Sequence, residues 1–237
     1  MFFVIFDGRE MDKMFKFEDA NIRGLFNKRF LSSINRKVEN LDSCIKKVEA
    51  ASNINFPECY IEPVLPIYTG STGEIAVYYA RTIPYPSLSG LSVIVEVSAA
   101  LLCYSTSLSL KIILAHELLH YIELVRRMSK FELLSDEVRS NSFEAAYSDL
   151  EKVIKPEYVY SDKRLVKLVA KKFENGFEDF KLKDKILNQW INKGKPVAEL
   201  PPEKNMVRIP VSIILTAKFD PFLLLRIKEI GKKAGMS

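Results

Sequence analysis

The amino-acid sequence predicts an α+β fold, in which one long helix precedes a small sheet and several helices follow it. Apolar residues recur every three or four positions in 27–51, which is the spacing of one buried helix face. Residues 56–98 instead contain short β-rich runs separated by prolines and glycines. From Ser105 onward the helical spacing returns. The order helix, sheet, helices is that of an α+β chain.

The individual elements follow from the same patterns. The first six residues are all apolar and predict a buried strand, because the run is too short for a signal peptide or a membrane span. Short runs rich in β-branched and aromatic residues predict two further strands, at 75–79 and 91–97. The helical spacing after Ser105 predicts helices at about 107–128, from there to about 154, and at 162–174, 181–192 and 221–233.

Composition limits the class of protein. The chain has 237 residues, of which 48% are apolar and 27% charged, so it can bury a sizeable core. The net charge is +5, and the lysine-rich stretches lie beside acidic residues, which indicates solvated helix faces rather than a nucleic-acid surface. The three cysteines are widely spaced and form no CxxC pair. We therefore expect a soluble, cytoplasmic protein with no nucleic-acid partner and no membrane span.

The residues best suited to chemistry are 116–120, which read His-Glu-Leu-Leu-His. On a helix, residues four apart share one face, so His116 and His120 can bind one metal ion. Glu117 then lies beside the open metal position as a general base. Zinc lowers the pKa of a bound water to ~7, and the pattern therefore predicts zinc-dependent peptide-bond hydrolysis. The chain has two histidines, and both lie in this motif.

A catalytic zinc ion usually has three protein ligands and one water. Because the chain has no third histidine, we expect a carboxylate from a helix that returns antiparallel to the first. Residues 129–132 fit a capping box at the start of such a helix. A short turn would place Glu137 level with His120, whereas a longer loop would place Glu144 there. The two glutamates lie seven residues apart on one helical face, so spacing alone does not choose between them.

Residues 93–102 and 112–121 resemble the catalytic core of HtpX-type and CAAX-prenyl-protease-type zinc metallopeptidases. In that family a strand end reading I-V-x-x-G-L-L precedes L-A-H-E-L-x-H, and Ala100 stands here in place of the glycine. The resemblance implies a zincin-like fold of the gluzincin type: a small mixed sheet, an active-site helix, an antiparallel glutamate helix, and additional N- and C-terminal helices. It covers 93–146 and 219–230, and the membrane helices of the family are absent from it.

The resemblance also bears on the third zinc ligand. Residues 137–146 resemble the family's E-x-x-A-D-x-F-A helix, whose first glutamate binds zinc, with Ser140 and Asn141 in place of Ala and Asp. This favours Glu137. The competing possibility is Glu144, because the sequence Glu-Ala-Ala that it begins resembles the start of the thermolysin glutamate helix.

A second part of the resemblance lies near the C-terminus. The family has H-P-x-x-x-x-R-I, and the chain keeps this spacing in 220–227 with Asp220 in place of the histidine. The family's arginine lies near the active site, so the resemblance implies that Arg226 polarises the carbonyl of the substrate.

Taken together, these patterns predict a single metallopeptidase domain over 1–237. Its expected parts are an N-terminal strand and helix (1–55), a zincin core (56–155) and a C-terminal helical region (156–237). The substrate would be a peptide or protein, bound as an added strand to 91–97 if that strand forms a sheet edge.

An alternative function comes from another class. Ala100, Asn141 and Asp220 depart from the family pattern at positions that support the site. These departures motivate a catalytically weak or inactive zinc-binding protein that acts as a binding or regulatory module.

Overall fold

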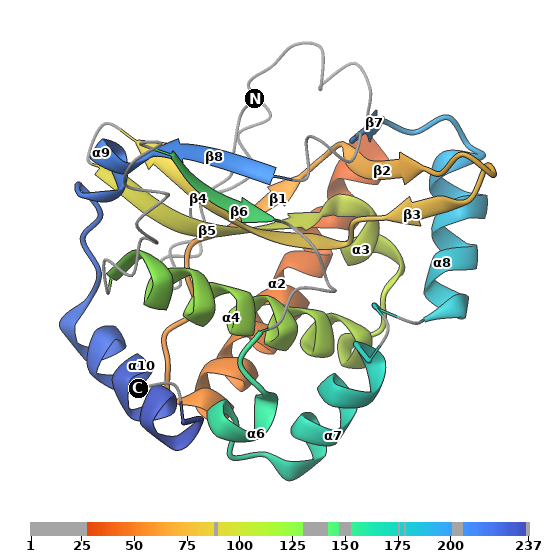
Figure 1. The fold of residues 1–237 in the computed structure, drawn as a ribbon. Helices are drawn as coiled ribbons and strands as arrows, with labels where there is room; N and C mark the ends of the chain where they lie inside the picture. The colour runs from red at the N-terminus through yellow and green to blue at the C-terminus, as the bar shows by residue number, and fades with distance from the viewer. Residues whose placement is uncertain are drawn as a thin grey trace.

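The structure, a computed structural model, confirms an α+β chain. Its strands form one layer, and α4 runs along the underside of that layer (Figure 1). The helices α6, α7 and α10 lie beyond α4, on the side away from the strands (Figure 1). The predicted strand at 1–6 lies outside the described part of the chain. The structure describes residues 28–87, 90–129, 142–146, 153–174, 176–177, 179–200 and 206–235.

Short strands and helices of very different lengths make up the described chain. The helices are α2 (Lys28–Ser52), α3 (Ala99–Tyr104), α4 (Ser107–Ser129), α6 (Pro156–Val159), α7 (Lys163–Lys172), α8 (Phe180–Ile186) with the π-helical turn Leu187–Ile191, α9 (Val211–Ile214) and α10 (Pro221–Lys233). The strands are β1 (Cys59–Glu62), β2 (Leu65–Thr69), β3 (Ile75–Val77), β4 (Ala80–Ser87), β5 (Gly90–Ser98), β6 (Ser142–Ala146), β7 (Val197–Glu199) and β8 (Met206–Pro210).

The strands pair in three small sheets, ordered β1-β5-β4, β3-β2-β7 and β6-β8. In the first sheet β5 runs parallel to β1 and antiparallel to β4, so this sheet is mixed, as expected. The prediction that 91–97 forms an exposed edge is wrong. Val95 pairs with Cys59 on one side and with Thr82 on the other, which leaves β5 in the centre and β4 at an edge.

The core lies between α2, α4 and this mixed sheet. On α2, Ile34, Leu41 and Val48 are fully buried at a seven-residue spacing, as the periodicity predicted. On α4, Leu114 and Leu118 are fully buried, and burial of each such side chain contributes roughly 1.5–3 kcal/mol. No glycine or proline interrupts α4, so a continuous helix carries the histidine motif through the centre of the protein.

The predicted helix from about 129 to 154 is wrong at 142–146. These residues form β6, which pairs antiparallel with β8, with Phe143 opposite Ile209. The β-branched residues of β8 favour strand pairing, and this long-range contact overrides the weak local helix preference of residues 142–146. Between the helices expected at 181–192 and 221–233, the structure has two strands, β7 and β8, that the sequence patterns did not predict.

In the described part of the chain, no helix combines the length and the hydropathy needed to cross a membrane.

Candidate metal centre

The two histidines of the motif point toward one another from neighbouring turns of α4. Their Nε2 atoms lie 3.0 Å apart, and their rings stand at 86° with centroids 4.6 Å apart. A tetrahedral zinc ion with Zn–N distances near 2.0–2.1 Å needs two nitrogens ~3.3 Å apart. Only a small rotation of the rings separates the present arrangement from that spacing. The histidine pair therefore fits a shared zinc ion.

His116 is held in place by an aromatic side chain from another helix. The ring of Phe173, directly after α7, stacks flat on its imidazole, with centroids 3.5 Å apart and planes at 8°. Phe177 packs beside Phe173 at 5.1 Å and against Tyr79 at 5.4 Å. Stacking covers a face of the imidazole and leaves its edge, where Nε2 lies, directed at His120. The cluster fixes the orientation that metal binding requires.

Glu117 is almost fully buried, at 3% exposure, and faces the sheet. The hydroxyl of Thr82 on β4 lies 2.7 Å from its Oε2 atom and 3.0 Å from its backbone carbonyl oxygen. The hydroxyl has one proton, so it donates to one of these oxygens at a time. A buried carboxylate needs such donors, and Thr82 supplies one from the edge strand.

The surroundings of Glu117 also affect Cys59. Burial, and after it the Glu117 carboxylate, raise the pKa of the Cys59 thiol far above its usual range. Cys59 therefore stays a protonated, unreactive thiol beside the motif. All three cysteines of the chain are free.

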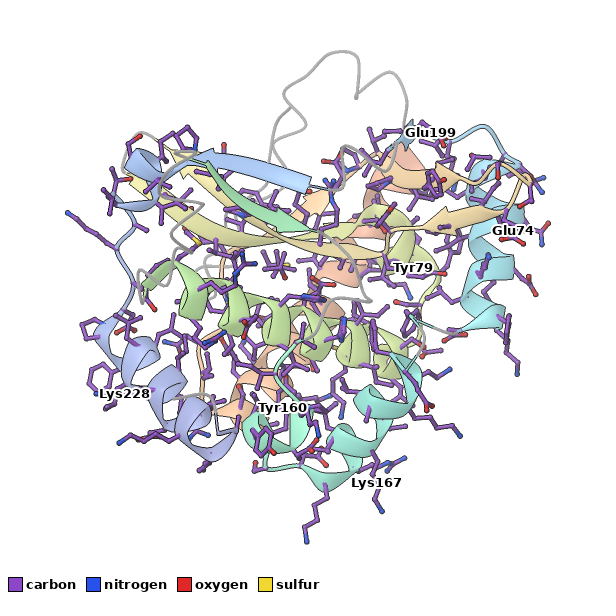
Figure 2. The ribbon with its side chains drawn as sticks, viewed as in Figure 1. Glu74, Tyr79, Tyr160, Lys167, Glu199 and Lys228 are labelled. Carbon is purple, nitrogen blue, oxygen red and sulfur yellow. The ribbon has the colours of Figure 1, made fainter. Side chains whose placement is uncertain are left out.

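A buried tyrosine secures α4 one residue before the motif. The hydroxyl of Tyr160 donates to the carbonyl oxygen of Ala115. Burial raises the pKa of Tyr160 well above its ordinary value, so it remains a neutral donor. Tyr160 lies beneath α4, whereas Tyr79 lies on the side of the strands (Figure 2). Tyr160 on one side and Thr82 of β4 on the other thus restrain this part of α4.

The structure describes one of the two candidates for the third zinc ligand and not the other. Glu137 lies outside the described residues. Glu144 lies in β6, where its backbone pairs with Arg208, and so it does not lie on the helix that was expected to face His120. Within the described residues, no group of three His, Cys, Asp or Glu side chains could hold a metal ion. The part of the donor set that the structure describes is the histidine pair.

Arg226 lies on α10, and the contacts described for it do not reach the motif. Its Nη1 atom donates to Glu229 at 3.0 Å, and its Nη2 atom donates to the backbone carbonyl of Ser52 at 3.3 Å. Asp220, which replaces the family's histidine, caps α10 by accepting from the backbone N–H of Phe222 at 2.9 Å. Arg226 instead lines a separate pocket, described below.

Two residues of the site were missed at the level of the sequence. Thr82 comes 35 positions before Glu117, and Phe173 lies at the end of a basic amphipathic helix. Neither position carries a local pattern that would distinguish it from an ordinary packing residue. Only the docking of β4 and α7 on α4 brings them to the motif.

Comparisons of the chain with protein-family models, curated proteins and solved structures find no match. The case for a function therefore depends on the geometry of α4 and its neighbours, together with the spacing of the motif.

Proposed function

We propose that the protein is a zinc-dependent metallopeptidase, in which His116 and His120 bind zinc and Glu117 is the general base. The observation that carries the proposal is the convergence of the two Nε2 atoms at 3.0 Å beside a buried glutamate on the same helix. When bound, zinc supplies Lewis-acid activation of water and of the substrate carbonyl. The third ligand is proposed to be Glu137, with Glu144 as the alternative.

In this proposal, residues of the chain transfer the proton and hold the reacting groups in position. Glu117 takes a proton from the attacking water and passes it to the leaving amine. The hydrogen bond from Thr82 holds the Glu117 carboxylate in one orientation, at 2.7 Å. Phe173 holds the ring of His116 and excludes water from one of its faces. These contacts provide the preorganised setting that proton transfer requires.

The proposed substrate-binding edge is β4 rather than β5. The backbone N–H of Ser98 donates to the carbonyl of Tyr79 at 2.9 Å, so odd-numbered residues of this segment direct their backbone groups toward β5. Even-numbered residues, including Thr82, direct theirs outward. Positions 84 and 86 share this even-numbered register, but both are prolines and have no backbone N–H to donate at the edge. A peptide added here would therefore pair best near Thr82, next to Glu117.

The decisive experiment measures zinc and peptide cleavage in one preparation. The purified full chain is loaded with zinc, assayed for metal by elemental analysis, and incubated with an unfolded protein substrate. We expect one zinc per chain, and we expect Glu117→Gln to lower the rate about 10²–10⁴-fold. The matched control is Glu123→Gln, since Glu123 lies on the same helix and pairs with Arg126 at 2.7 Å. Absence of zinc after loading would sink the proposal.

A second candidate function is a zinc-stabilised binding protein with little activity. The observation that favours it is burial: His116 is 2% exposed and Glu117 is 3% exposed, which leaves little room for a peptide carbonyl. This candidate predicts bound zinc and a loss of stability in His116→Ala, without any rate that depends on Glu117. Clear turnover by the wild type would exclude it.

A further inference from the structure

A second site lies on the other side of α4 from the sheet. A pocket of about 160 Å³ opens between the loop after α2, α4 and the first turns of α10. Its volume is close to the ~150 Å³ of an engineered cavity that accepts benzene, so it can hold one side chain. No residue of the His116–His120 motif lines it. The residues that define it are Asn53, Asn55, Phe56, Tyr121, Phe222 and Arg226.

The guanidinium of Arg226 is the main polar feature of this pocket. Its Nη1 and Nη2 atoms donate to Glu229 and to the carbonyl of Ser52. Its Nε atom is buried, and within the described residues it has no hydrogen-bond partner. A guanidinium presents its donors in a planar fork that matches a carboxylate. The Arg226 side chain keeps 23% of its surface exposed, so an acidic group in the pocket would pair with the part of this fork that solvent reaches.

The other polar lining groups can serve the same ligand. The Tyr121 side chain is buried, and no hydrogen bond is described for its hydroxyl. Asn53 and Asn55 are exposed at the pocket and add amide donors. Asp220 also lines the pocket, but its Oδ1 atom already accepts from the N–H of Phe222 at the start of α10.

An apolar surface adjoins the pocket on α10. Phe222 is 82% exposed and Leu225 is 57% exposed, and large apolar side chains that stand this far into solvent beside a pocket are typical of an interaction site. The helix itself is basic, since it carries Arg226, Lys228, Lys232 and Lys233 against one acid, Glu229. This charge favours an acidic partner.

We propose that the pocket and the exposed face of α10 bind an extended segment of a partner protein, in which a glutamate or aspartate has apolar neighbours. The acidic side chain enters the pocket and accepts from the guanidinium of Arg226. An apolar neighbour covers Phe222. This interaction does not depend on whether the protein is a peptidase.

The test uses the isotope-labelled full chain and the blocked peptide acetyl-Phe-Glu-Leu-amide, followed by amide chemical shifts. We expect the peptide to shift the resonances of Asn53, Asn55 and Phe222. The counterpart with glutamine in place of glutamate should bind about 10- to 100-fold more weakly, because it lacks the charge-assisted hydrogen bond. Equal binding of the two peptides, or no shift at these residues at the solubility limit of the peptide, would overturn the proposal.

Three variants test whether the peptide binds at this pocket and at the exposed face of α10. Arg226→Gln should lose the preference for glutamate over glutamine. Because Arg226 also binds the carbonyl of Ser52, Phe222→Ser provides a second test that leaves the core intact, and it should weaken binding about tenfold. Lys167 is exposed on α7, outside α10 and the pocket lining (Figure 2), so Lys167→Gln should change the affinity by no more than about twofold. If 3-phenylpropionate binds as tightly as the peptide, the site takes a free small acid and the partner-protein proposal is wrong.

Discussion

The hydroxyl of Thr82 lies 2.7 Å from Oε2 of Glu117 and thereby joins the edge strand β4 to the central helix α4. Both residues are buried, with 7% and 3% of their surface exposed. A hydrogen bond in such a setting fixes the direction of the carboxylate and satisfies part of its need for donors. It links the stability of the sheet–helix contact to the orientation of the proposed general base.

Replacing the Thr82 hydroxyl should show whether it orients the Glu117 carboxylate without affecting substrate binding. Thr82→Val keeps the shape and removes the donor, which leaves a buried carboxylate oxygen less well satisfied and costs about 1–3 kcal/mol of unfolding free energy. In the peptidase assay, kcat should fall about 10- to 100-fold with KM nearly unchanged, since the contact serves proton transfer. Thr82→Ser restores the hydroxyl and should restore kcat. Equal kcat values in the valine and serine variants would contradict the positioning role.

The stack between Phe173 and His116 leads to a prediction about zinc affinity. Phe173→Ala removes the ring that lies 3.5 Å from the imidazole and lets His116 rotate away from His120. We expect zinc to bind about tenfold more weakly, at the lower end of the effect of changes around metal ligands. Competition with a chromophoric chelator measures this affinity. Phe180→Ala is the matched control, because Phe180 is 75% exposed and belongs to another helix.

Bound zinc should also stabilise the fold. A ligand present at 100- to 1,000-fold above its Kd stabilises the folded state by about 2.7–4.1 kcal/mol. Urea unfolding with zinc and with a chelator should differ by about this amount in the wild type. In His120→Ala the difference should disappear, because one of the two convergent nitrogens is lost. A zinc effect of the same size in this variant would place the metal elsewhere.

The fold was predictable where the pattern is local. The helices α2, α4 and α10 follow the apolar spacing of their own residues, so their positions could be predicted closely. The central place of β5 and the strand β6 depend on partners far away in the chain, such as Cys59 and Ile209, and local spacing carries no information about them. Residues 142–146 were for this reason predicted as helix.

The candidate site shows the same difference between what local spacing predicts and what depends on long-range packing. The motif His116–His120 lies on one helix, and its spacing alone predicts two nitrogens on one face. Thr82 and Phe173 reach the motif only through tertiary packing, and Arg226 lines a different pocket from the one that the family resemblance implied. The residues that orient the motif therefore become visible only in the three-dimensional structure.

Asp162 gives a prediction about pH and the helix that leads to Phe173. Its carboxylate caps α7 by accepting from the backbone N–H groups of Leu165 at 3.1 Å and Arg164 at 2.9 Å. The hydrogen bond from Leu165, followed by that from Arg164, holds the pKa of Asp162 below its ordinary value. The cap therefore stabilises the folded state fully above the ordinary pKa of aspartate, and this stabilisation is lost as the pH falls through the lower, folded-state pKa.

The measurement is urea unfolding at pH 7 and at several acidic pH values. At pH 7, Asp162→Ala should lower the unfolding free energy by about 1 kcal/mol, and Asp162→Asn should cost less, because asparagine also caps helices well. Below the folded-state pKa the wild type should lose its advantage over the alanine variant, since a protonated carboxyl is a weaker acceptor. A difference between wild type and Asp162→Ala that stays constant down to the lowest pH would show that the charge of the cap does not contribute.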